Sequence, residues 1–153
     1  MKPIANTFII IMLMITICQV AWTQGVPNNT TMYNRENLLG KKWTTTKNIQ
    51  GKVISFSYVF DNDSITNVII INNDTTVLRY AYYLANTPHD YFNSSLVGTR
   101  SEGNWLILCR QYTQNGMIRN DRANMKIFSL TDNELSYGKS PDFPMVLTAM
   151  PLE

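Results

Sequence analysis

The chain has 153 residues, of which 44% are hydrophobic, 11% aromatic and 16% charged, and its formal net charge is +2. This length predicts a single domain, and the apolar fraction is sufficient for a hydrophobic core. Because the net charge is small and no run of lysines or arginines occurs, we expect no nucleic-acid partner.

Residues 1–23 have the pattern of a secretory signal peptide. Lys2 supplies the positive start, and the apolar stretch that follows, residues 8–17, is too short to span a membrane comfortably. Ala21 and Thr23 are small residues at the two positions that a signal peptidase recognises, which predicts cleavage before Gln24. We therefore expect an exported protein, either periplasmic or extracellular.

Cys18 leaves a second alternative open, in which the protein is a lipoprotein acylated on this cysteine and anchored to the cell envelope. Ile17 stands where such signals normally carry a small residue. We expect membrane contact only through this anchor. The mature chain would retain Cys109 alone, which excludes an intramolecular disulfide. Cys109 is interpreted as a buried, unreactive side chain on a strand.

Residues 24–36 are polar and show no sustained pattern, so we interpret them as a flexible arm before a domain that spans residues 37–153. In that domain the apolar residues alternate with a period of two or form short runs between turn residues, which is typical of strands. Strands are predicted over residues 42–49, 52–60, 64–71, 75–85, 105–112, 123–130, 134–137 and 145–150.

The segments between these strands are mostly tight turns. Asn115-Gly116 is a strong hairpin signal, and residues 101–104 are also predicted to turn. Residues 86–98 and 139–144 are predicted loops, with a short strand expected near 96–100. The pattern over residues 117–122 is weak.

Strands joined by such short connections are antiparallel neighbours, because a parallel crossover needs a dozen residues or more. A flat sheet of this length would expose two edges, whereas closure into an up-and-down barrel removes them. We therefore predict an all-β fold, a single antiparallel barrel of about eight strands. A β-sandwich is the alternative that the pattern leaves open.

The segment Leu38-Leu39-Gly40-Lys41-Lys42-Trp43 resembles the start of the first strand in lipocalins, with two residues between the glycine and the tryptophan instead of the usual one. Segments 82–84, 92–98 and 127–135 are similar to small exported lipocalin-like proteins of the Bacteroidetes type. The resemblance implies an eight-stranded barrel with an open mouth, in which Gly40 and Trp43 are structural. It also implies a basic side chain over the tryptophan from the last strand; residues 145–150 contain none, which leaves Arg122 or Lys126.

Catalytic chemistry is not indicated. His89 is the single histidine, and beside Asp90 in a loop it is interpreted as solvated. No nucleophile–base pair, metal-ligand cluster or cofactor motif occurs, so we expect no enzyme activity, metal or cofactor.

The aromatic residues at alternating strand positions carry the functional prediction. A small barrel either fills its interior with side chains or holds one small ligand. In the first case the chain would be an envelope interaction or structural module that recognises a protein partner through its loops. In the second it would bind a small, mostly apolar molecule. The residues predicted to line such a pocket are Phe56, Tyr58, Tyr80, Tyr82 and Trp105.

Overall fold

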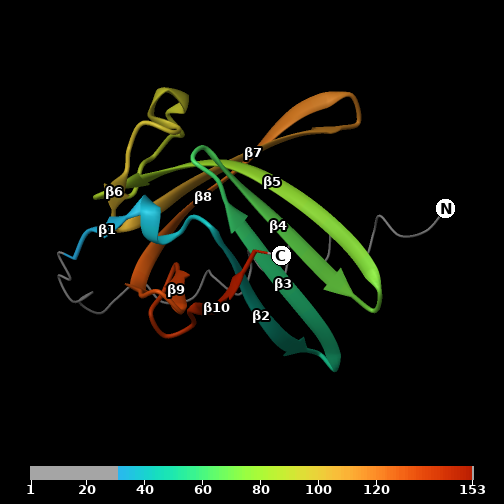
Figure 1. Ribbon diagram of the computed structural model, residues 1–153. Coiled ribbons are helices and arrows are strands. Elements are labelled where there is room, and N and C mark those ends of the chain that lie inside the picture. The colour runs from blue at the N-terminus through green and yellow to red at the C-terminus, as the bar shows by residue number, and fades with distance from the viewer. Residues whose placement is uncertain (1–30, 153) are drawn as a thin grey trace.

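The computed structural model describes residues 31–152, and the predicted signal peptide, Cys18 and residues 24–30 lie outside that range. The described chain is built from strands and two short 3-10 helices, η1 and η2 (Figure 1). None of its helices is long and apolar enough to cross a membrane. The elements are β1 (Tyr33–Asn34), η1 (Arg35–Asn37), β2 (Lys41–Ile49), β3 (Lys52–Phe60), β4 (Ser64–Ile71), β5 (Asp74–Ala85), η2 (Ser94–Leu96), β6 (Glu102–Gly103), β7 (Trp105–Gln114), β8 (Met117–Leu130), β9 (Glu134–Gly138) and β10 (Met145–Pro151).

Eight strands form a closed barrel in the order β10-β2-β3-β4-β5-β7-β8-β9. Every neighbouring pair is antiparallel, and each strand lies beside its neighbours in the chain until β10 closes on β2. The predicted up-and-down barrel is confirmed, and the sandwich alternative is wrong. Closure leaves no sheet edge around the ring, which is the physical advantage that favoured the barrel.

Alternation along the strands decides which side chains fill the barrel. In β3, Ile54, Phe56, Tyr58 and Phe60 all belong to the main core cluster. Burial of such large apolar side chains stabilises the fold by about 1.5–3 kcal/mol each. The intervening side chains of β3 point outward, as the period of two requires.

Three of the tight turns have the same backbone conformation. The first residues of these turns, Gln50, Asn72 and Asn115, have φ values of 52°, 50° and 52°, and the second residues also have positive φ. Two successive positive φ values define the type I′ turn, whose twist matches that of the flanking strands. The Asn115-Gly116 hairpin is therefore confirmed, and it extends β8 back to Met117, over residues where the sequence pattern was weak.

Pairing at two seams of the barrel covers only part of each strand. β5 pairs with β7 only over Ala81–Ala85, and β2 pairs with β10 only over Lys41–Thr44. Beyond these segments the β7–β8 hairpin and the sheet β2-β3-β4-β5 project in different directions (Figure 1). The barrel therefore has an open end, at the three type I′ turns, and a closed end opposite.

Trp43 packs at the closed end. Its side chain is fully buried, and its indole Nε1 donates a hydrogen bond to the Leu38 carbonyl over 2.9 Å. Gly40 has φ +70°, a left-handed conformation that glycine adopts without strain, and it brings Leu38 back over the tryptophan. The basic group above the ring is Lys41, whose Nζ lies 5.5 Å from the ring centroid. Neither Arg122 nor Lys126 takes that position, because both point outward from β8.

Part of the predicted flexible arm is ordered structure. β1 pairs with β6, and the Tyr33 hydroxyl donates to the Phe128 carbonyl over 3.0 Å. Arg35 Nη1 lies 3.0 Å from both the Asn62 and the Gly98 carbonyls, so one guanidinium joins two connections at the closed end. The folded unit therefore begins before residue 37.

The long connection between β5 and β7 also differs from the prediction. Residues 96–100 form no strand; η2 and a turn occupy this segment. Residues 101–104, predicted as a hairpin turn, contain β6. Gly103 lies so close to Ala85 that an added Cβ would approach the Ala85 carbonyl oxygen to 2.5 Å. Only glycine allows this approach without a backbone shift.

Candidate functional site

Four of the five residues predicted to line a pocket do face the barrel interior. Phe56 and Tyr82 belong to its packed core, where Tyr82 meets Phe60 edge to face at 5.7 Å between ring centroids. The Tyr82 hydroxyl donates to the Asp61 carbonyl over 2.8 Å, so this polar group is satisfied at the closed end. Tyr80 lies farther toward the open end than Tyr82 on β5, and Tyr58 lies between Phe56 and Phe60 on β3.

Trp105 does not line the interior, and this placement was wrong. It packs on the outer face of the barrel against a second apolar cluster that includes Tyr83 and Ile107. Leu106 and Leu108 face the main core instead. Because successive strand residues point to opposite faces, Trp105 must point outward when Leu106 points inward.

A group of polar side chains, which we call the inner cluster, faces the barrel interior; on β3 and β4 the core residues Phe56 and Ile69 lie on its open-end side. It comprises Tyr58, Asn67, Tyr80, Arg110, Asp121 and Tyr137, which come from six different strands. Within it, the Tyr58 and Tyr137 rings meet edge to face at 6.3 Å.

Burial alters the acidity of the phenols in the inner cluster. It raises the pKa of Tyr58 to about 12, against a lowering effect of hydrogen bonds with Tyr137 and Asn67. The pKa of Tyr137 is raised well above its usual value, again chiefly by burial. Burial likewise raises the pKa of Tyr80, while the nearby Arg110 charge opposes it. These tyrosines are neutral hydrogen-bonding groups at physiological pH.

Asn67 is one of two members of the inner cluster with an unmet hydrogen-bonding requirement. Its side chain is only 6% exposed, and its Oδ1 has no hydrogen-bond partner. A buried amide oxygen without a donor costs about 1–3 kcal/mol. Such a group is satisfied by a water molecule or by a ligand.

Arg110 supplies the positive charge of the inner cluster. Its Nη2 lies 2.8 Å from Asp121 Oδ2, and its guanidinium lies over the Tyr112 ring at 4.7 Å and the Tyr80 ring at 6.0 Å. The Arg110 Nε is buried without a partner. The inner cluster thus holds both an unused acceptor, on Asn67, and an unused donor.

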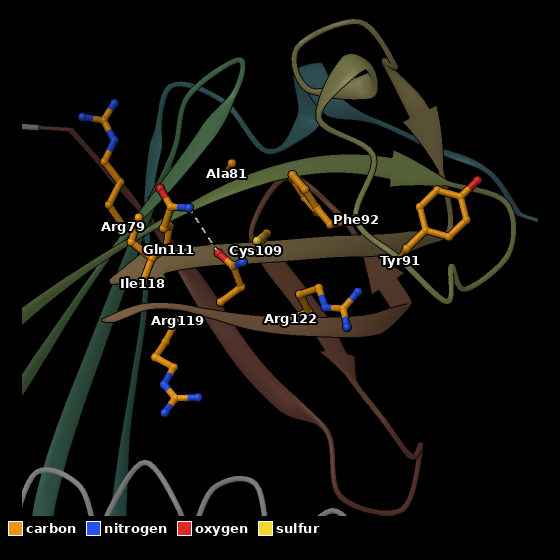
Figure 2. A pocket seen from close by; sticks show the side chains of 10 residues that line it. Arg79, Ala81, Tyr91, Phe92, Cys109, Gln111, Ile118, Arg119 and Arg122 are labelled. Carbon is orange, nitrogen blue, oxygen red and sulfur yellow. Dashed lines mark hydrogen bonds between the residues drawn. The ribbon is translucent and has the colours of Figure 1, made fainter. Parts of the chain in front are cut away.

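A cavity of the described chain lies on the outer face of the barrel, and we call it the outer groove (Figure 2). Its volume is about 770 Å³. Strands β5, β7 and β8 form its floor, and the β5–β7 connection forms its wall. The lining residues are Arg79, Ala81, Tyr91, Phe92, Cys109, Gln111, Ile118, Arg119, Asn120 and Arg122.

Cys109 lies in the floor of the outer groove and is half-buried, so the interpretation as a fully buried side chain was wrong. Partial burial raises the pKa of its thiol, and the Arg122 charge lowers it to a smaller extent. A raised pKa lowers the fraction of reactive thiolate at neutral pH.

His89 anchors the wall of the outer groove and is not simply solvated, as the sequence suggested. Its Nδ1 lies 2.8 Å from the Tyr83 hydroxyl, and the same hydroxyl accepts a bond from the Asn93 amide over 3.2 Å. Asn124 joins β8 to the loop through its Nδ2, which donates to the His89 carbonyl over 2.8 Å. These contacts fix residues 89–93 on the barrel.

Sequence reasoning missed Asn67, Arg110, Asp121 and Tyr137, although a signal for two of them was present. Asn67 lies on the same face of its strand as Ile65, Ile69 and Ile71, so an amide at an inward position could have been recognised from the sequence. Arg110 likewise continues the alternation of Leu106 and Leu108. Asp121 and Tyr137 carried no comparable local signal.

No protein-family model, curated protein or solved structure matches this chain. Among residues 31–152, histidine, cysteine, aspartate and glutamate side chains form no group of three or more that could hold a metal ion.

Proposed function

We propose that the chain is a lipocalin-like binding protein that holds a small, mostly apolar molecule at the open end of its barrel, without catalysing a reaction. The observation that carries the proposal is the buried Asn67 Oδ1, which lacks a donor inside the barrel. A ligand that donates a hydrogen bond there would recover the free energy that this group otherwise loses.

The inner face of the sheet β2-β3-β4-β5 would receive the apolar body of the ligand. Beyond the closed ring, the inward residues Ile49, Ile71 and Leu78 are apolar and only partly buried. Covering apolar surface of this kind contributes about 25 cal/mol per Å². Partly exposed side chains therefore remain available for contact with a ligand.

The inner cluster would orient the polar end of the ligand. Asn67 Oδ1 needs a donor, whereas Arg110 Nε needs an acceptor. A hydroxyl or amide group supplies both donor and acceptor, so long-chain alcohols and fatty amides match this pair better than hydrocarbons do. Of the residues predicted to line a pocket, Tyr58 and Tyr80 belong to the inner cluster.

Thermal shift with fatty alcohols, fatty amides and matched alkanes tests the proposal. We expect the alcohols and amides to raise the melting temperature, and Asn67→Leu to abolish most of this shift. The leucine removes the unsatisfied Oδ1 together with the hydrogen bond to Tyr58, and because these effects oppose each other the ligand-free variant should keep its stability to within about 1 kcal/mol. Asn120→Leu, at an exposed position of the outer groove, is the control and should respond to ligand as the parent does. Equal shifts in the parent and Asn67→Leu, or no shift with any compound, would refute ligand binding at this position.

A second function, recognition of a protein partner by the loops of a filled barrel, is favoured by a different observation. Trp43, Phe60 and Tyr82 fill the closed end, while the two predicted recognition loops expose Tyr91 and Phe143 to 67% and 75%. Exposed aromatic residues are frequent anchors in protein interfaces. Affinity capture from an envelope extract should then recover a stoichiometric partner that Tyr91→Ser or Phe143→Ser no longer retains; capture that both variants leave intact would argue against it.

Export, to the periplasm or the exterior, is proposed on the sequence of residues 1–23 alone. The lipid-anchored form is proposed in the same way on Cys18. Metabolic labelling with a fatty acid distinguishes the two, because Cys18→Ala removes the label only if this cysteine is acylated.

A further inference from the structure

The outer groove is a second candidate site, separated from the inner cluster by the thickness of the barrel wall. Ala81, Cys109 and Arg122 form a row across β5, β7 and β8, since Ala81 pairs with Cys109 and Cys109 with Arg122. Alanine and cysteine are small, whereas Phe92 rises beside them from the loop (Figure 2). The outer groove therefore exists because the two small side chains of Ala81 and Cys109 lie at the centre of its floor, with larger side chains around them.

Positive charge at the outer groove is not neutralised within the described chain. The lining contains Arg79, Arg119 and Arg122 but no acidic residue. The ion pairs found in residues 31–152 are Lys41–Asp132 and Arg110–Asp121, so none of the three arginines is in one. Asp121 is next to Arg122 in the chain, yet it faces the barrel interior and binds Arg110. Strand alternation thus keeps the Asp121 carboxylate out of the groove.

The three arginines differ in how they are placed (Figure 2). Arg79 lies at one end of the floor, where its Nη2 donates to the Ser64 hydroxyl over 3.0 Å. Arg122 lies on the opposite side, below Phe92. Arg119 points away from the groove, as its position in the alternation of β8 requires. Arg122 is therefore the cation beside Phe92, Arg79 lies at the other end of the floor, and Arg119 serves as a control.

The wall of the outer groove offers flat apolar surface. Tyr91 is 67% exposed, and Phe92 is held by a tilted ring contact with Tyr83 at 5.3 Å between centroids. The floor adds the amide pair Gln111–Asn120, whose Nε2 and Oδ1 lie 3.5 Å apart. Because hydrogen bonds from Tyr83 and Asn124 fix the wall, little ordering would be required when a ligand binds.

From this arrangement we propose that the outer groove binds a small soluble organic anion, in which a phosphate or carboxylate group is attached to a planar apolar body. Arg122 binds the anionic group through charge-assisted hydrogen bonds, to which the planar guanidinium is suited, and Arg79, at the other end of the floor, adds longer-range attraction. The planar body packs against Phe92 and Tyr91 over Ala81 and Cys109. This ligand differs in charge from the one proposed for the barrel interior.

Calorimetry on the full chain with phenyl phosphate and benzoate, and with phenol as the uncharged match, tests the proposal. We expect saturable binding of at least one anion, and weaker binding of phenol. Arg122→Gln should weaken anion binding about tenfold, the loss of one charge-assisted hydrogen bond. Arg119→Gln removes the same charge nearby and should leave the affinity within about twofold, since it alters only screened, longer-range electrostatics.

The rate of alkylation of Cys109 reports whether a ligand occupies the outer groove, because its thiol lies in the groove floor. In a Cys18→Ser background, the bound anion should slow alkylation of Cys109 by N-ethylmaleimide, and Arg122→Gln should remove this protection. Asn67→Leu, which tests ligand binding in the barrel interior, should leave this protection of Cys109 unchanged.

Three results would overturn the proposal. The first is no saturable binding of either anion to the folded chain. The second is an equal loss in Arg119→Gln and Arg122→Gln, which would indicate non-specific attraction by net charge. The third is association with anionic phospholipid vesicles without binding of either soluble anion, which would assign this surface to a membrane. Circular dichroism and urea unfolding of each variant establish that it is folded.

Discussion

Asn67 occupies a position where the alternation of β4 would place an apolar side chain. Its neighbours at the same alternation, Ile65 and Ile69, fill the core, so the amide is desolvated without full compensation. Arg110 repeats the pattern in β7, where Leu106 and Leu108 precede it on the inner face. Polar residues at inward positions destabilise a barrel unless they are satisfied, and for that reason they indicate function.

The buried phenols of the inner cluster predict a loss of stability at alkaline pH. Folding raises the pKa of Tyr58 from 10.0 to about 12, so the folded chain binds this proton more tightly than the unfolded chain does. The resulting stability is fully present below pH 10 and is lost as the pH rises from 10 toward 12. For Tyr58 the effect is on the order of 3 kcal/mol.

Urea unfolding between pH 8 and roughly 11.5, spanning the usual and the raised tyrosine pKa, measures this effect. The free energy of unfolding should fall above pH 10, and Tyr58→Phe should make the fall shallower. Tyr112→Phe, a half-buried tyrosine nearer the hairpin tip, is the control. If Tyr58→Phe did not change how steeply the free energy of unfolding falls with pH, this result would contradict a raised pKa for the Tyr58 phenol.

At the scale of the elements, three hairpins share the type I′ turn but differ in how well their residues suit it. Asn72 and Asn115 adopt left-handed φ readily, since a short polar side chain tolerates that region. Gln50 takes the same position with φ 52°, and it has no such tolerance. The β2–β3 turn therefore retains local strain that the other two turns avoid.

We expect Gln50→Asn to raise the free energy of unfolding by about 0.5–1 kcal/mol, because it relieves this backbone conformation. The reverse change at the equivalent position, Asn115→Gln, should lower it by a similar amount. The midpoints of urea unfolding, compared at a constant m value, measure both changes in the free energy of unfolding. If both substitutions moved the midpoint in the same direction, the explanation by turn conformation would fail.

At the scale of the whole molecule, the closed end depends on contacts between segments far apart in the chain. Arg35 joins the β3–β4 turn to the β5–β7 connection, and Tyr33 reaches the Phe128 carbonyl on β8. Leu38 covers Trp43. The open end lacks such bridges within the described residues, since the β7–β8 hairpin and the opposite sheet diverge there.

A chain begun at Asn37 should therefore melt at least about 5 °C below one begun at Thr31, as expected for the loss of roughly 1 kcal/mol in a domain of this size. Differential scanning calorimetry measures the difference. Arg35→Met in the longer chain removes the guanidinium contacts with the Asn62 and Gly98 carbonyls but keeps β1 and η1. It should reproduce part of the decrease in melting temperature. Equal melting temperatures would place the boundary of the folded unit at residue 37 after all.

The sequence by itself determined the all-β class, most strand positions and the inward face of β3 and β5. These depend on a period of two and on turn residues, which are local properties. The resemblance of residues 38–43 to the start of the first lipocalin strand also implied that Gly40 and Trp43 are structural.

Only the tertiary structure decided which residues meet. The inner cluster assembles side chains from six strands, and Asp121 and Tyr137 join it through the register of β8 and β9. The outer groove depends on a long loop that folds back on three strands, which no local pattern encodes. Trp105 was misplaced for the same reason: the periodicity of β7 shows that its faces alternate, but closure against β5 and β8 determines which face is inside.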